Sequence, residues 1–187
     1  RKLLYPFQFD IGNVPSSNEM RLKYDIPQSA FVVFFNFDFG SSFNRKNPNG
    51  AMRAFAKAFK GTPDANLVFK TKSAKSHPKE LDALQELADE LGISNQFKTI
   101  NDYIPQRDLY GLTNACDVYL SLHRGEGLGL GIAEAMSLGK AVVITDYSGS
   151  TEFCTRENSI PIPCRLDDIP PDMHDHACYL NVKRWAE

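Results

Sequence analysis

The chain is organised around Ser121-Leu-His-Arg-Gly-Glu-Gly-Leu-Gly-Leu-Gly-Ile-Ala-Glu-Ala-Met-Ser-Leu-Gly139. This pattern is typical of the end of a strand, a glycine-rich turn and a short helix. Alternating glycines leave the backbone free to adopt positive φ and let a ligand approach the main chain closely. The helix that follows presents free amide N–H groups and the positive end of its dipole. We therefore expect this turn to bind an anion, and a phosphate fits best.

Two carboxylates belong to the same stretch. Glu126 lies in the turn and Glu134 in the helix, with seven residues between them. A carboxylate is poorly suited to a phosphate, but it readily accepts hydrogen bonds from sugar hydroxyls. For Glu134 the alternative is a carboxylate that only stabilises the start of the helix through its dipole. A phosphate-binding turn beside two hydroxyl-binding carboxylates indicates a nucleotide-sugar site.

The rest of the chain alternates between strands and helices. The run over residues 30–37 is continuously apolar and rich in β-formers, which is typical of a central parallel strand buried on both faces. The alternation predicts an α/β class with a Rossmann-like parallel sheet flanked by helices. Further strands are predicted over 66–69, 96–100, 117–122, 141–145 and 159–163, and helices are predicted from Pro48, around 81–91 and over 106–116.

Residues 1–28 contain three prolines and are expected to be an irregular lead-in or interdomain segment. Residues 29–187 are expected to form a nucleotide-binding domain. The chain begins at Arg1 rather than Met and stops after Trp185-Ala-Glu187, so we expect a fragment or a single domain of a longer protein.

A second phosphate-binding signal follows the first strand. Arg45 and Lys46 precede the Asn47-Pro48 start of a helix, and ligands of open α/β sheets bind outside the carboxyl ends of the strands. The alternative is two solvated charges on a loop. Tyr103 follows the third strand in the same way and could stack on a base or simply pack as an aromatic residue.

Two common nucleotide motifs are absent. A dinucleotide fingerprint needs glycines at relative positions 1, 3 and 6, and no register of this turn supplies them. A P-loop needs Ser or Thr after Gly-Lys, but Gly139-Lys140 is followed by Ala141. A Rossmann dehydrogenase and a P-loop NTPase are therefore disfavoured.

Composition narrows the class further. The 187 residues suit one domain with a sizeable core, and the net charge of −2 gives no support for nucleic-acid binding. The sequence has neither an apolar run of membrane-spanning length nor a signal-peptide pattern. His174, His176 and Cys178 alternate near the end, but we expect a solvated loop there and no metal site.

The stretch from His123 to Met136 resembles the EX7E motif of retaining GT-B glycosyltransferases of family 4 (group 1). The strand exit Phe-Asn-Phe-Asp-Phe with Arg45-Lys46-Asn-Pro48, and the later Thr145-Asp-Tyr-Ser-Gly149 with Glu152-Phe153, fit the same family in order and spacing. The similarity covers most of residues 30–187. It implies the C-terminal half of a GT-B fold, which binds the nucleotide-sugar donor.

The resemblance also implies roles for individual residues. Lys46, with Arg45 beside it, would hold the donor diphosphate; Glu134 would bind the ribose hydroxyls, and Glu126 would face the donor sugar. Glu126 and Lys46 would then be the catalytic residues, and Tyr103 the base-binding one. The backbone amides that would hold the phosphates from the helix side are those of Gly127, Leu128, Gly129 and Leu130. Many members carry an extra Arg where this chain has Gly40-Ser41, so the role of Arg45 is less secure than that of Lys46.

Family members transfer a hexose with retention and without an essential metal, and the expected co-substrate is a GDP- or UDP-sugar with no cofactor. The acceptor, a glycan or lipid-linked glycan, would bind an N-terminal domain that is absent here. We expect a cytoplasmic protein, with peripheral association at the cytoplasmic face of a membrane as an alternative. Three other functions stay open: a stand-alone nucleotide-binding module, a GT-B-like epimerase and a phosphorylase.

Overall fold

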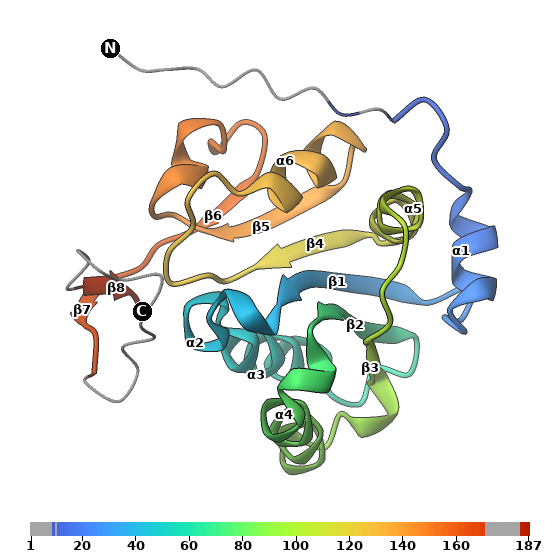
Figure 1. Cartoon of the computed structure of the whole chain (residues 1–187), viewed down its shortest axis with the longest axis horizontal. Coiled ribbons are helices and arrows are strands. Elements are labelled where there is room, and N and C mark those ends of the chain that lie inside the picture. Colours follow the sequence, from blue (N-terminus) through green and yellow to red (C-terminus); the bar gives the residue numbers. More distant parts are fainter. Residues whose placement is uncertain (1–8, 10, 171–183) are drawn as a thin grey trace.

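The computed structural model of the protein describes residues 9, 11–170 and 184–187. Its centre is a six-stranded sheet in the order β3-β2-β1-β4-β5-β6 (Figure 1). Every neighbouring pair in this sheet is parallel. The strands span Phe31–Asp38 (β1), Ala65–Lys72 (β2), Phe97–Ile100 (β3), Val118–Ser121 (β4), Ala141–Thr145 (β5) and Ile160–Ile162 (β6). The predicted Rossmann-like parallel sheet is confirmed.

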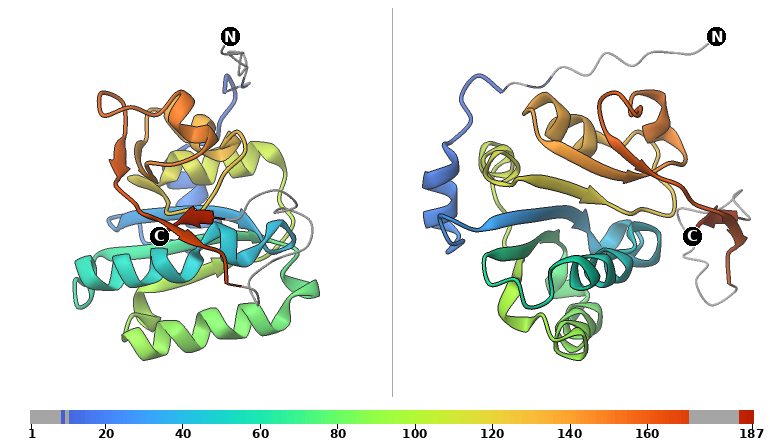
Figure 2. Two further views of the ribbon diagram at one scale, coloured as in Figure 1. Left: turned by 90° about the vertical axis from the view of Figure 1, so that its left-hand side faces the viewer. Right: turned by 180° about the vertical axis from the view of Figure 1, so that it is seen from behind.

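Helices cover both faces of this sheet (Figure 2). They span Ser17–Lys23 (α1), Phe43–Lys46 (α2), Pro48–Phe59 (α3), Pro78–Leu91 (α4), Gln106–Ala115 (α5) and Leu130–Ser137 (α6). Short 3-10 turns lie at Phe39–Ser41, Ala74–Ser76, Ser94–Gln96 and Gly149–Glu152. The helices expected from Pro48, around 81–91 and over 106–116 are therefore confirmed, and so is the short helix after the glycine-rich turn.

Side-chain alternation along β1 divides the core between the two faces. Val33, Phe35 and Phe37 pack with buried residues of α3 and α4 on one face. Val32 and Phe34 pack with buried residues of α1, α5 and α6 on the other. Because successive strand residues point to opposite faces, Asn36 and Asp38 continue the second face at the carboxyl end of β1. Polar side chains therefore replace the apolar core at that end of the strand.

The strand order reverses between β1 and β4. The chain runs outward from β1 through β2 to β3, then returns and runs outward again through β4, β5 and β6. The carboxyl ends of β1 and β4 consequently diverge into connections that leave in opposite directions. In open α/β sheets this reversal is where ligands bind.

The lead-in segment departs from expectation, because residues 17–23 form the helix α1 rather than irregular chain. Ser16 caps its first turn by accepting a hydrogen bond from the Glu19 N–H. Met20 is fully buried against the α5 side of the sheet. The helix is only seven residues long and lies between two prolines, so its sequence carries little periodic signal. Its stability comes from tertiary contacts, which overrode the local pattern.

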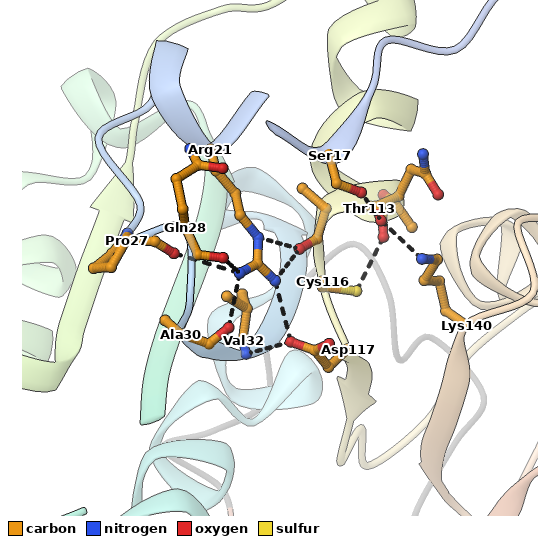
Figure 3. A network of polar contacts seen from close by, with 12 residues as sticks. Ser17, Arg21, Pro27, Gln28, Ala30, Val32, Thr113, Cys116, Asp117 and Lys140 are labelled. Atoms are coloured by element: carbon orange, nitrogen blue, oxygen red, sulfur yellow. Dashed lines mark hydrogen bonds and ion pairs between the residues drawn. The ribbon is translucent and has the colours of Figure 1, made fainter. Parts of the chain in front are cut away.

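Arg21 makes the main polar contacts between α1 and the rest of the fold (Figure 3). Its guanidinium donates to the carbonyl of Ala115, at the end of α5, through both Nε (3.0 Å) and Nη2 (2.8 Å). Nη1 donates to the Ala30 carbonyl at 2.8 Å, and Nη2 lies 3.2 Å from the Asp117 carboxylate. Asp117 also accepts from the backbone N–H of Val32 at 2.7 Å. This network fastens α1 to the amino-terminal edge of β1 and β4, at the opposite end from the strand exits.

Two stretches beside the site are more regular than the elements predicted from the sequence. After β1 the chain forms a 3-10 turn (Phe39–Ser41) and then α2 (Phe43–Lys46), so that Arg45 and Lys46 end a helical turn. The strand expected over 66–69 extends to Lys72, which places Lys70 and Thr71 inside the sheet. Pairing with the full length of β1 stabilises the longer strand, although its last residues are polar.

A small two-stranded antiparallel sheet of Leu166–Asp168 (β7) and Arg184–Ala186 (β8) lies against the glycine-rich turn. The Ala186 N–H donates to the Arg124 carbonyl at 3.0 Å, and the Arg124 side chain pairs with Glu187. His174, His176 and Cys178 lie outside the described residues. Within the described ranges no helix is long and apolar enough to cross a membrane, and no group of three potential metal ligands occurs.

Candidate functional site

A cavity of about 610 Å³ opens at the carboxyl ends of β1 and β4, where the strand order reverses. The ends of β1, β2 and β4 form its floor. The chain between β3 and α5 forms one wall, and the glycine-rich turn with the start of α6 forms another. The polar and charged residues that line it come from these elements, from the 3-10 turn after β1 and from α2; they include Asn36, Asp38, Ser41, Lys46, Lys70, Lys72, Tyr103, Gln106, Ser121 and Glu126.

The glycine-rich turn is shaped by its contact with the turn after β5. The Gly149 N–H donates to the Glu126 carbonyl at 3.0 Å, and the Glu126 N–H donates to Ser148 Oγ at 2.8 Å. A Cβ at Gly149 would lie only 1.6 Å from the Gly127 carbonyl oxygen, so a side chain cannot be accommodated there. The two turns are therefore packed backbone to backbone.

Helix α6 begins at the cavity wall. Gly129 precedes it with φ of 73° in the left-handed region, and Leu130 and Gly131 at its first turn line the cavity. The first N–H groups of a helix have no acceptor within the helix, and they carry the positive end of its dipole. The start of α6 therefore offers the cavity an electropositive wall suited to an anion.

Lys46, Glu126 and Arg45 form the main charged cluster of the site. Lys46 Nζ lies 2.5 Å from Glu126 Oε2, and Arg45 Nη1 lies 3.5 Å from the same oxygen. Burial alone would raise the pKa of Glu126, but the two cations offset this and hold the pKa below its ordinary value. Glu126 is thus a carboxylate at neutral pH, and the cluster carries a net positive charge.

Arg45 is fixed mainly by backbone carbonyls. Its Nη1 donates to the Gly125 carbonyl at 2.7 Å, and its Nη2 donates to both the carbonyl and Oγ of Ser41 at 2.8 Å. The Arg124 N–H donates to the Arg45 carbonyl at 2.8 Å. These bonds tie the end of α2 to the glycine-rich turn across 80 residues of sequence.

Asn47 joins the start of α3 to the end of β4. It adopts the left-handed conformation with φ of 57°, caps α3 by accepting from the Gly50 N–H, and donates to the Leu122 carbonyl at 2.9 Å. The cap predicted from Asn47-Pro48 is confirmed. Because the same side chain also binds the end of β4, the helix start and the glycine-rich turn share one anchor.

Glu134 lies one turn into α6 and is half-buried. Its Oε1 accepts a hydrogen bond from Gln106 Nε2 at 3.3 Å. Burial raises the pKa of Glu134, and a hydrogen bond with Tyr110 partly opposes this rise. Among the described residues, Gln106 lines the cavity whereas Glu134 does not. The carboxylate therefore meets the cavity from behind the Gln106 amide.

The structure brings most of the predicted site residues to one cavity. Six of them line it: Lys46, Tyr103, Glu126, Leu128, Gly129 and Leu130. Arg45, Gly127 and Glu134 do not line it, but each is in contact with the chain that does. Tyr103 is 85% exposed, so the alternative that it packs in the core is wrong.

Several residues of the site were not found from the sequence. Gln106 begins α5 and Lys70 lies near the end of β2; both line the cavity. Tyr119 and Ser121 reach it from β4, on the same face as Asn36. Strand alternation could have identified Ser121, since it is two residues beyond Tyr119 on a buried strand.

His123 is a buried residue of the motif itself. It is fully buried, and its Nε2 lies 3.1 Å from Ser150 Oγ. Burial lowers the pKa of His123 to about 4, so the imidazole is neutral at neutral pH. It joins the end of β4 to the turn after β5, beneath the glycine-rich turn.

Comparison with known proteins identifies the family. The family model described as Glycosyl transferases group 1 matches residues 18–159. The serotype-specific mannosyltransferase WbdA of Escherichia coli is 30% identical over 118 residues, which are 60% of this chain and 14% of that protein. The chain thus spans only a small part of that relative.

Solved structures share the fold. A glycosyltransferase from Rickettsia africae ESF-5 superposes with a TM-score of 0.69 at 20% identity, over 82% of this chain and 39% of that one. Anabaena Alr3699/HepE, crystallised with UDP and glucose, gives 0.69 at 22% identity over 83% and 41%. The C-terminal domain of the group 1 protein LpcC from Francisella tularensis gives 0.63 at 21% identity over 81% and 77%. The fold is that of GT-B glycosyltransferases, and because the family model covers most of its length, this chain belongs to the group 1 glycosyl transferases.

Proposed function

We propose that this chain is the donor-binding domain of a retaining GT-B glycosyltransferase of family 4, which transfers a hexosyl group from a nucleoside-diphosphate sugar to a glycan or lipid-linked acceptor. The observation that carries the proposal is that Lys46, Glu126 and the start of α6 line one cavity, with Arg45 in contact with Glu126 from outside its lining. Two sources of positive potential, the Lys46 ammonium and the start of α6, therefore line the same cavity as the Glu126 carboxylate. Such an arrangement suits a diphosphate attached to a sugar.

The named relatives agree with a hexosyl donor. WbdA is named a mannosyltransferase, and Alr3699/HepE has been crystallised with UDP-glucose. Both names concern those proteins. These names support a hexose donor, with UDP as one candidate nucleotide; for this chain we propose a GDP- or UDP-hexose used without a cofactor.

In the proposed reaction the bond between the sugar C1 and the β-phosphate oxygen breaks, and a new bond forms between C1 and the acceptor oxygen. The acceptor proton passes to the leaving phosphate oxygen on the same face. Lys46, Arg45 and the amides of the α6 start stabilise the charge that develops on the diphosphate, so no metal ion is required. This is electrostatic stabilisation aimed at the leaving group.

Glu126 is well suited to hold the donor sugar. Its lowered pKa keeps it ionised, and a carboxylate accepts hydrogen bonds from sugar hydroxyls. The alternative is a covalent glycosyl–Glu126 intermediate, in which Glu126 attacks C1 as the diphosphate leaves. Glu134, behind the Gln106 amide, is proposed to accept hydrogen bonds from the ribose, and Tyr103 to stack on the base.

Calorimetric titration with UDP, GDP and ADP in the absence of metal tests the proposal. We expect selective binding of one diphosphate, with the affinity lowered in Lys46→Ala and Glu134→Ala. Failure of all three nucleotides to bind the chain, repeated with a protein that also contains the acceptor domain, would contradict the nucleotide-sugar assignment.

A further inference from the structure

A buried lysine lies in the cavity and has no part in the mechanism above. Lys70, near the end of β2, is 5% exposed and lines the cavity. It is paired with Asn36 of β1 on one side and with Ile100 of β3 on the other. Its side chain belongs to the face of the sheet that Val68 shares with α5 and α6.

The surroundings of Lys70 leave part of its hydrogen-bonding capacity for another group. Lys70 Nζ donates to the Thr71 carbonyl at 2.5 Å. An ammonium has three N–H donors, so this bond uses one of them. Burial lowers the pKa of Lys70, and the negative charges of Asp102 and Asp38 oppose this effect. A buried ammonium is costly unless it is well paired, and because Lys70 lines the cavity, a ligand there could supply a further acceptor.

Lys70 lies at the end of the cavity away from the residues proposed to bind the diphosphate. Lys46 and Leu130 mark the end proposed for the diphosphate, and Gln106 stands in front of the proposed ribose carboxylate. Lys70 lies beside Ile100, directly before the connection that carries Tyr103.

The connection after β3 is itself fastened to β2. Thr71 Oγ1 donates to Asn101 Oδ1 at 2.5 Å, so the residue next to Lys70 holds the start of this connection. Lys70 and the exposed Tyr103 thus line the same cavity, joined through Thr71 and Asn101, and if Tyr103 stacks on the base as proposed, Lys70 lies at the base end of the site.

We propose that Lys70 donates a hydrogen bond to O4 of a uracil or O6 of a guanine in the donor nucleotide, and so selects these bases over cytosine and adenine, which carry an amino group at that position. The inference rests on the proposed function. Lysine can donate but cannot accept, and uracil O4 and guanine O6 are acceptors. Cytosine and adenine carry an N–H₂ donor at the corresponding position. This amino group and the Lys70 ammonium would both be donors, so no hydrogen bond could form between them.

The test is calorimetric titration of the wild-type protein and two variants with four diphosphates. UDP is compared with CDP, and GDP with ADP, so that each pair differs mainly in the carbonyl or amino group. Lys70→Met removes the donor and keeps an unbranched chain that is favourable in a buried site. Lys72→Met is the matched control, because it removes the same charge from the same strand and cavity at an exposed position.

We expect the wild-type protein to favour one keto base over its amino counterpart by about tenfold or more, the effect of one charge-assisted hydrogen bond. Lys70→Met should lose most of this ratio with an unchanged melting temperature or a higher one, whereas Lys72→Met should weaken all four nucleotides by a similar factor and keep the ratio. If Lys70→Met left the ratio of keto-base to amino-base affinity unchanged without weakening binding, Lys70 would make no contact with the nucleotide. If it weakened all four nucleotides by the same factor, Lys70 would contact the phosphates. Either result would overturn the proposal. If no nucleotide binds the wild-type protein, the proposed function itself fails.

Discussion

Lys46 Nζ and Glu126 Oε2 are 2.5 Å apart, and the two side chains are equally buried at 16% exposure. They come from connections 80 residues apart, one after β1 and the other after β4. A diphosphate at the start of α6 would compete with Glu126 for the same ammonium. The carboxylate that is proposed to hold the sugar thus also limits how strongly Lys46 attracts the phosphates.

This competition predicts opposite effects for the two partners. Glu126→Gln should bind a nucleoside diphosphate more tightly, by about three- to tenfold, because Lys46 and Arg45 lose their internal counter-charge. Lys46→Met should bind it at least about tenfold more weakly, since it removes a charge-assisted contact. Titration with UDP and GDP without metal measures both changes.

The exposed Lys57 of α3 provides the control for net charge, and Lys57→Met should leave the affinity unchanged. Weaker diphosphate binding in Glu126→Gln would show that Glu126 positions Lys46 instead of competing for it. In that case the transfer rate and the nucleotide affinity should fall together.

Glu134 and Gln106 make a prediction about the ribose. Glu134→Ala should weaken binding of UDP or GDP by about tenfold and leave the affinity for the 2′,3′-dideoxy analogue almost unchanged, because only the ribose hydroxyls donate to the carboxylate. Gln106→Ala should have a smaller effect of the same kind, since it acts by orienting Glu134. Equal losses for the ribo- and dideoxynucleotides would exclude the ribose contact.

The same contact should depend on pH. Burial raises the pKa of Glu134, so the carboxylate is protonated at a higher pH than an ordinary glutamate. A protonated carboxyl accepts hydrogen bonds less well, and nucleotide affinity should therefore fall as the pH drops through this raised pKa. Glu134→Gln removes the titrating group and should flatten that part of the profile.

Gly149 and Gly125 test how the glycine-rich turn is held. Gly149→Ala should lower the free energy of unfolding by about 3 kcal/mol, because its Cβ would collide with the Gly127 carbonyl. Gly125→Ala meets nothing within 4 Å and should change stability by less than about 0.5 kcal/mol. Urea unfolding of both variants measures the difference, and similar losses would mean that backbone flexibility matters more than the contact.

The sheet could be predicted from the sequence because its strands are apolar runs that local pattern resolves. The strand over 141–145 has the predicted bounds, and Asn47-Pro48 begins a helix as expected. Helix α1 was missed because Met20 and Arg21 stabilise it through contacts made almost a hundred residues away. The last residues of β2 were missed for the same reason, since Lys70 belongs to the strand through its pairing with β1.

The sequence predicted which residues belong to the site better than it predicted how they are arranged. The motif and the resemblance supplied the identities of Lys46, Glu126 and Glu134, but neither contains distances between connections. The contact of Gln106 with Glu134 joins the starts of two helices 28 residues apart, and no spacing rule connects them. Such contacts follow from the packing of α5 beside α6, which only the assembled fold determines.

His123 gives the final prediction, which concerns stability and pH. Its pKa in the folded chain is about 4, below the ordinary value of 6.5, so between these two pH values the unfolded chain binds a proton that the folded chain does not. Folding stability should therefore fall as the pH drops from 6.5 to 4, by up to ~3 kcal/mol from this residue alone. His123→Gln can still donate to Ser150 and should lose that part of the pH dependence in urea unfolding, whereas His77→Gln, a partly exposed control, should keep it. Parallel pH profiles for wild type and His123→Gln would mean that the folded chain admits a proton to this imidazole, and that the base of the glycine-rich turn opens to solvent.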